Sequence, residues 1–85
     1  MRPSGDKRLL EALGIEIKAR RRELKASQEE IAGRCALDRP YLTLIESGRK
    51  QPTLSVLFKL AQALELTFAE LASRVEDRYH SLPSP

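Results

Sequence analysis

The chain has 85 residues, with 15 lysines and arginines against 12 acidic residues and a single cysteine. This length predicts one domain, near the lower limit of what folds without cross-links, and one cysteine excludes an internal disulfide. No apolar run approaches the roughly 18–20 residues that span a membrane, and the N-terminus lacks a signal-peptide core, so we expect a cytoplasmic protein.

The positive charge is concentrated in the first part of the chain. Residues 1–50 contain twelve Lys/Arg and eight Asp/Glu, whereas residues 51–85 contain three and four. A basic N-terminal half is expected if one end of the molecule contacts a polyanion. A solvated basic face without a partner is the alternative, and charge alone does not decide between them.

Residues 1–6 are predicted to form a flexible arm, because they are rich in Pro, Ser and Gly, and Asp6 could cap a first helix. Arg20 and Arg22 of that helix are predicted to point to solvent. Arg21 lies on its inward side and needs a buried partner, because an unpaired buried charge costs several kcal/mol. Helical spacing defines this inward side through four apolar residues: Leu10, Leu13, Ile17 and Leu24.

Two short helices joined by a tight turn are predicted between Ser27 and Glu46. Ser27 and Glu30 have the spacing of a capping box that opens the first of them. The turn is predicted at Ala36-Leu37, and Asp38 is predicted to cap the second helix, with Pro40 in its first turn. The inward positions of the pair are expected to be Ile31, Ala32, Cys35, Leu42 and Ile45, with Gly33 facing outward.

Two more helices follow Gly48, which is predicted to end the previous helix in a left-handed conformation. Thr53 is expected to cap a fourth helix, whose apolar stripe is Leu54, Leu57, Leu60, Ala61 and Leu64. Thr67 and Glu70 form a second capping-box pattern that opens a fifth helix. We therefore predict an all-α domain of five helices over residues 7–76, followed by a C-terminal tail over residues 77–85.

The sequence shows no signal for catalysis or for a metal. His80 has no Cys, His or carboxylate cluster around it, and Cys35 is interpreted as a small core residue. No nucleophile–base pair, glycine-rich phosphate loop or carboxylate dyad is recognisable. The predictions are therefore no enzymatic activity, no cofactor and no small-molecule ligand.

The run from Leu13 to about Val75 resembles the lambda-repressor/Cro-type helix-turn-helix domain, also called the XRE family. The resemblance is carried by SQEEIA, DRPYLTLIESGRKQPT and LFKLAQALELTFAEL, in this order and spacing. The short length and the DRxY start of the third helix are similar to the controller proteins of restriction–modification systems. The resemblance implies a transcriptional regulator that binds a two-fold operator on double-stranded DNA as a homodimer, without enzymatic activity.

The resemblance also implies roles for individual residues. Four match the outward positions of a helix that reads bases: Arg39, Pro40, Thr43 and Leu44. Four match positions that contact the DNA backbone: Gln28, Ser47, Arg49 and Lys50. Arg21 and Glu46 match a buried ion pair between the first and third helices. Three junctions where the family often has Gly carry Lys25, Ala36 and Glu65, each of which needs a left-handed conformation or a differently shaped turn.

The chemistry of the base-reading positions is mixed. Arg39 can bind guanine O6 and N7 together, with a phosphate contact or a surface salt bridge as the competing interpretations. Thr43 can offer a hydroxyl or a methyl group. Pro40 and Leu44 offer no side-chain hydrogen bond, so they are expected to make apolar contacts, for instance with a thymine methyl.

The fifth helix has more apolar surface than so small a core can use, which favours a dimer interface. The candidate interface residues are Leu66, Phe68, Leu71 and Val75. An antitoxin or another protein-interaction module with the same fold is the alternative function. Such a module is expected to have an acidic or apolar third-helix face, against which the cations Arg39, Arg49 and Lys50 argue.

Overall fold

Residues 6–83, which the computed structural model describes, fold into five α-helices without a β-strand. The predicted arm lies outside the described residues except for Asp6. The helices are α1 (Lys7–Glu23), α2 (Gln28–Arg34), α3 (Arg39–Glu46), α4 (Leu54–Ala63) and α5 (Phe68–Ser81). This confirms the predicted all-α class.

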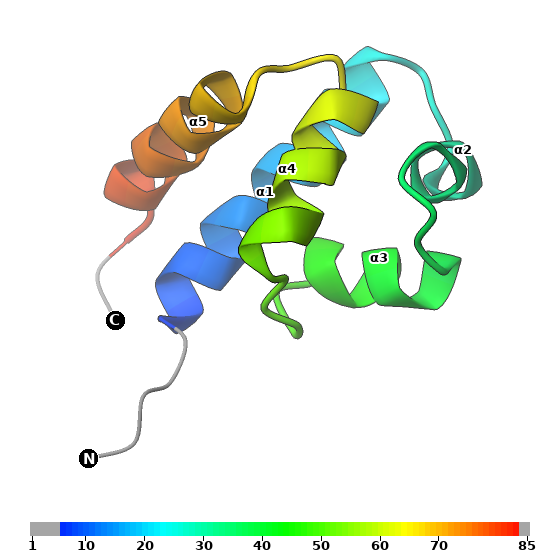
Figure 1. Cartoon of the computed structure of the whole chain (residues 1–85). Coiled ribbons are helices and arrows are strands. Elements are labelled where there is room, and N and C mark those ends of the chain that lie inside the picture. Colours follow the sequence, from blue (N-terminus) through cyan, green and yellow to red (C-terminus); the bar gives the residue numbers. More distant parts are fainter. Residues whose placement is uncertain (1–5, 84–85) are drawn as a thin grey trace.

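Helix α1 is the centre of the arrangement. It packs against α3 on one side and α5 on the other, and α4 packs against both α2 and α5 (Figure 1). Helices α2 and α3 follow each other through a short turn and contact each other directly. The helix-turn-helix pair is therefore mounted on α1 and α4, with α5 at the far side of the molecule.

The helix starts follow the predicted capping residues with one exception. Asp6 and Thr53 accept backbone hydrogen bonds at the starts of α1 and α4. Both predicted capping boxes, Ser27 with Glu30 and Thr67 with Glu70, are complete. Asp38 occupies the N-cap position of α3, but its side chain makes no capping hydrogen bond. The prediction that Asp38 caps the helix with its side chain was therefore wrong.

The first four helices all end in the same left-handed turn. The residue after each C-cap has a positive φ: 56° at Lys25, 55° at Ala36, 74° at Gly48 and 60° at Glu65. In each case the next N–H donates back into the last turn, as Leu37 does to the Ala32 carbonyl at 2.9 Å, which is the Schellman motif. Of the two outcomes expected at the three non-glycine residues, a left-handed conformation or a differently shaped turn, the structure has the first, at a cost of about 1 kcal/mol each.

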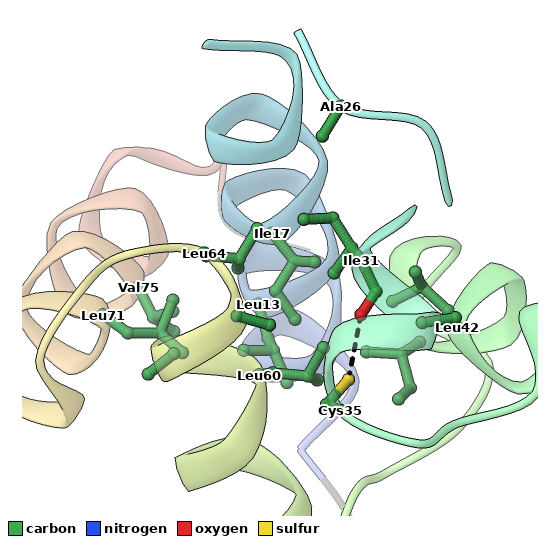
Figure 2. Packing of buried hydrophobic residues seen from close by; sticks show 14 of the residues in the cluster. Leu13, Ile17, Ala26, Ile31, Cys35, Leu42, Leu60, Leu64, Leu71 and Val75 are labelled. Atoms are coloured by element: carbon green, nitrogen blue, oxygen red, sulfur yellow. Dashed lines mark hydrogen bonds between the residues drawn. The ribbon is translucent and has the colours of Figure 1, made fainter. Parts of the chain in front are cut away.

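The core is built around α1 and closed by all the other helices (Figure 2). Its fully buried large side chains are Ile17, Ile31, Leu42, Ile45, Leu60, Leu64 and Leu71. Cys35 is buried among them, its thiol donates to the Ile31 carbonyl at 3.2 Å, and burial raises the pKa of the Cys35 thiol. The predicted core role of Cys35 is confirmed.

Helix α5 is longer than the sequence predicted. It continues to Ser81, and Leu82 packs against the core, so residues 77–82 are not a loose tail. Buried Glu16 of α1 accepts hydrogen bonds from Arg74 at 3.2 Å and Arg78 at 2.7 Å. Arg8 of α1 donates to the Tyr79 and Leu82 carbonyls at the end of α5. These contacts with α1 hold the last turns of the helix, where Tyr79 and Leu82 continue the apolar spacing of Leu71 and Val75 and pack against the core.

The prediction for Arg20 was also wrong, whereas Arg22 is exposed as expected. The Arg20 side chain is half-buried and donates from Nε to the Leu64 carbonyl at 2.9 Å. It also pairs with Glu23, which is bound in turn by Arg74. Arg20 therefore satisfies an end carbonyl of α4 while it pairs along α1, which links three helices.

Candidate nucleic-acid interface

Helix α3 has one buried side and one exposed side. Leu42 and Ile45 are completely buried in the core. The four predicted base-reading residues are all exposed: Arg39, Pro40, Thr43 and Leu44. The helix lies along an edge of the molecule, so this exposed side is accessible over its whole length (Figure 1). An α-helix with such a free side fits the width of the DNA major groove.

The predicted partners Arg21 and Glu46 lie in contact beneath this helix. Arg21 Nε donates to Glu46 Oε2 at 2.7 Å and Nη2 donates to Oε1 at 3.0 Å, which is a bidentate pair. The side chains are only 12% and 4% exposed. The hydrogen bond to Glu46 raises the pKa of Arg21. Arg21 also donates to the Ala26 carbonyl, so it joins α1, the turn before α2, and α3.

Gln28 and Thr43 extend this network towards the exposed side. Gln28 Nε2 donates to Glu46 Oε1 at 3.0 Å, and Gln28 Oε1 accepts from the Thr43 hydroxyl at 3.0 Å. The Thr43 hydroxyl also lies 3.1 Å from the Arg39 carbonyl oxygen. Both side chains are thus used in bonds within the protein. This connection between α2 and α3 was not foreseen from the sequence.

The start of α2 and the start of α3 border the same cleft. It has a volume of about 380 Å³ and is lined by Arg21, Ser27, Gln28, Glu29 and Arg39. The structure therefore brings a predicted phosphate contact, Gln28, close to a predicted base contact, Arg39. A strand of DNA backbone passing the end of α2 would meet both.

The loop after α3 presents its two cations to solvent. Gly48 turns the chain in a left-handed conformation, and Arg49 and Lys50 are exposed directly after it. Ser47 is the C-cap of α3, and its hydroxyl donates to the Leu44 carbonyl at 3.0 Å. The loop therefore offers charge from Arg49 and Lys50, while the Ser47 hydroxyl is engaged locally.

Two of the four residues predicted for a dimer interface have almost no exposed surface in a single chain. Leu71 and Val75 are only 2% and 8% exposed and belong to the core of one chain. Leu66 is partly buried against that core, and Phe68 is half-buried. The prediction assumed a short fifth helix and a core too small to use its apolar residues. The helix instead packs along α1. Leu71 and Val75 are therefore covered within one chain, whereas Phe68 keeps part of its surface exposed.

A different apolar surface is exposed on α4. Leu54 and Phe58 are 70% and 51% exposed, and the Phe58 ring lies 6.2 Å from the Phe68 ring between centroids. Leu54 was predicted to face inward as part of the α4 stripe, which was wrong. Its spacing of four residues from Phe58, which falls outside that stripe, was the signal that could have revealed this surface. We call Leu54, Phe58 and Phe68 the α4–α5 patch.

The described residues contain neither a cluster suited to a metal ion nor a helix suited to crossing a membrane. Residues 6–83 contain no group of three or more His, Cys, Asp or Glu side chains that could hold a metal ion. Within the same range, none of the helices combines the length and apolar character needed to cross a membrane.

Comparison with known proteins places this geometry in a family. The helix-turn-helix family model matches residues 17–71. An uncharacterized HTH-type transcriptional regulator, y4dJ of Sinorhizobium fredii, is 39% identical over 57 residues, which cover 67% of this chain and 74% of the relative.

Solved structures with the same fold include restriction–modification controller proteins. That of C.AhdI from Aeromonas hydrophila is 34% identical, with a TM-score of 0.71 over 73% of this chain and 94% of that one. That of C.Esp1396I, a tetramer in complex with its natural 35 base-pair operator, is 26% identical, with a TM-score of 0.80 over 86% of this chain and 96% of that one. The chain described here belongs to the helix-turn-helix family of transcriptional regulators.

Proposed function

We propose that this protein is a sequence-specific regulator that binds double-stranded DNA as a homodimer on a two-fold operator. The observation that carries the proposal is the exposed side of α3, which is fixed from below by the bidentate Arg21–Glu46 pair and flanked by Arg39 and the loop cations. A rigid helix with cations at both ends can enter a major groove and contact the phosphates beside it.

The role of each residue in this proposal follows from its position. Arg39, at the first position of α3, reads guanine, and Pro40, Thr43 and Leu44 line the groove behind it. Arg49 and Lys50 neutralise phosphates, and they give the salt-dependent part of the affinity. Gln28 and Ser47 contact the backbone through atoms that their internal bonds leave accessible.

The similar solved structures indicate which kind of regulator to propose. Controller proteins of restriction–modification systems share the fold, and one of them was solved on its operator. We therefore propose a controller-type regulator that acts in the cytoplasm, where its operator lies. An antitoxin or protein-interaction module is the alternative, and the exposed cations Arg39, Arg49 and Lys50 favour DNA over it.

Two variants test DNA binding and separate its components. Arg39→Ala is expected to relax the preference at one base position by about 1–3 kcal/mol. Lys50→Ala is expected to weaken all sequences alike and to lower the slope of log affinity against log salt by about one. The measurement is a salt titration of each protein with random duplexes and with an operator selected from a random library. Equal wild-type affinity for all sequences, or no binding at low salt, would contradict the proposal.

The homodimer is tested on the α4–α5 patch. Phe58 is half-exposed, so burying its exposed part in a dimer contributes about 1 kcal/mol per chain. Losing this contribution in both chains weakens dimerisation at least about 30-fold. Phe58→Lys is expected to shift the protein to monomer in sedimentation equilibrium and to lower operator affinity. Ser55→Lys, with the same added charge on the same helix, is the control and should remain dimeric. Wild-type protein that is monomeric on its operator would rule out the dimer.

A further inference from the structure

The middle of the exposed side of α3 is apolar. Pro40 and Leu44 are one helical turn apart, so they lie on the same side of the helix, and both are exposed. Leu44 is 39% exposed. Neither side chain can donate or accept a hydrogen bond.

The hydrogen-bonding groups next to these residues are already engaged. The Thr43 hydroxyl lies 3.0 Å from Gln28 Oε1 and 3.1 Å from the Arg39 carbonyl, and Ser47 Oγ donates to the Leu44 carbonyl. Gln28 is held by Glu46 as well as by Thr43. Free polar groups therefore occur at the two ends of the α3 surface, at Arg39 and at Arg49, and carbon surface lies between them.

We infer that the centre of each DNA half-site is read through a pyrimidine C5-methyl group that packs against Leu44, with Pro40 beside it. This inference rests on the proposed DNA-binding function and gives the chemistry of its central contact. Among the base edges of the major groove, the only apolar group is the C5-methyl of thymine. 5-Methylcytosine carries the same group at the same ring position, so the ligand chemistry is a 5-methylpyrimidine.

Leu44 also selects against bases without this methyl. Placing a leucine against the polar edge of guanine or unmodified cytosine removes water from donors and acceptors without replacing their hydrogen bonds, which is unfavourable. Packing a C5-methyl group against Leu44 instead removes apolar surface of both groups from water, which is favourable. The discrimination therefore has an attractive part and an exclusion part.

The test removes single methyl groups from the DNA. An operator is first selected from a random library with the full chain, and each thymine is then replaced by deoxyuridine in both half-sites, which removes only the methyl. At one or two positions we expect a loss of about fourfold per methyl, or about 16-fold for a symmetric pair, and no change elsewhere. Equal affinity for thymine and deoxyuridine at every position would overturn the inference.

Protein variants assign the contact to a residue. Leu44→Ala should bind the thymine and deoxyuridine operators equally at the sensitive position. Leu9→Ala, which shortens an exposed leucine on α1, should keep the full discrimination. If Leu44→Ala still distinguishes the two operators, the assignment to Leu44 fails. The comparison of thymine and deoxyuridine operators uses only the wild-type protein, so it remains valid even if a variant folds poorly.

A second pair of operators distinguishes the two sources of the methyl group. The sensitive T·A pair is replaced by C·G, with and without a 5-methyl group on the cytosine. Tighter binding of the methylated form shows that the methyl is read on either base, whereas equal binding identifies thymine as the source. Failure to select any operator would contradict the proposed function itself, and this outcome is distinct from a specific operator that ignores its methyl groups.

Discussion

Replacing Glu46 by alanine is expected to destabilise the protein by about 3–5 kcal/mol, because Arg21 would remain in place without its partner. The Arg21 side chain is 12% exposed, and two of its three nitrogens donate to Glu46. The third nitrogen donates to the Ala26 carbonyl, so the guanidinium is held on all sides by hydrogen bonds within the protein. For a domain of this size the loss corresponds to a fall in melting temperature of more than about 10 °C.

Two further variants make the result specific. Glu76→Ala removes an exposed glutamate from α5 and should leave the melting temperature nearly unchanged. The double variant Arg21→Met with Glu46→Leu removes both charges together and should be more stable than Glu46→Ala, since no buried charge remains unpaired. A melting temperature of Glu46→Ala within a degree or two of the wild-type value would contradict the structural role of the pair.

The consequence for DNA binding follows from the position of Glu46 at the end of α3. Its carboxylate contacts Arg21 of α1 and Gln28 of α2, and Gln28 contacts Thr43 on the exposed side. The orientation of the proposed reading helix is thus set by hydrogen bonds from both neighbouring helices. Such preorganisation removes part of the entropy cost that binding would otherwise carry.

Local signals in the sequence predicted most of the fold. Capping residues have fixed offsets from helix starts, so Ser27 with Glu30 and Thr67 with Glu70 indicated two helix starts directly. The left-handed conformations at Lys25 and Ala36 were one of two outcomes expected from the family resemblance, since the family often has Gly at these junctions. These features depend on neighbours within a few residues.

Two of the errors, at the end of α5 and at Arg20, concern contacts between residues distant in sequence. The last turns of α5 are held by Glu16, which lies 58 and 62 residues before its partners Arg74 and Arg78. Tyr79 and Leu82 extend the apolar spacing of Leu71 and Val75, so part of this helix end was visible in the sequence, whereas the pairing of charged residues with Glu16 was not. The same reason explains Arg20, whose partner is a backbone carbonyl of α4, a group present in any sequence.

The sequence predicted which residues of the candidate site are exposed, but not the hydrogen bonds that they make. All four base-reading candidates are exposed, yet the sequence could not show that the Thr43 hydroxyl is used by Gln28. Hydrogen-bond partners across a helix pair depend on the crossing geometry, which no local pattern encodes. Apolar contacts at Pro40 and Leu44 were predicted from the sequence, and the structure adds that the Thr43 hydroxyl beside them is already hydrogen-bonded.

Gly14 lets helix α1 approach the backbone of α3 closely. Replacing Gly14 by alanine is expected to destabilise the protein by about 3 kcal/mol. A Cβ added at Gly14 would lie 2.8 Å from the Ile45 carbonyl oxygen and closer still to that of Glu46. Both obstacles are backbone atoms, so no side chain can rotate away. Helices α1 and α3 would have to separate, which opens the core around Ile45 and stretches the Arg21–Glu46 pair.

Gly33 provides a matched control, because a Cβ added there meets nothing within 4 Å. Gly33→Ala, on the exposed side of α2, should raise stability by up to about 1 kcal/mol through the higher helix propensity of alanine. Urea unfolding of the two variants measures both effects, which have opposite signs for the same chemical change. If Gly14→Ala is as stable as the wild type, α3 does not pack on α1 as closely as described, and its orientation must be set by the ion pair alone.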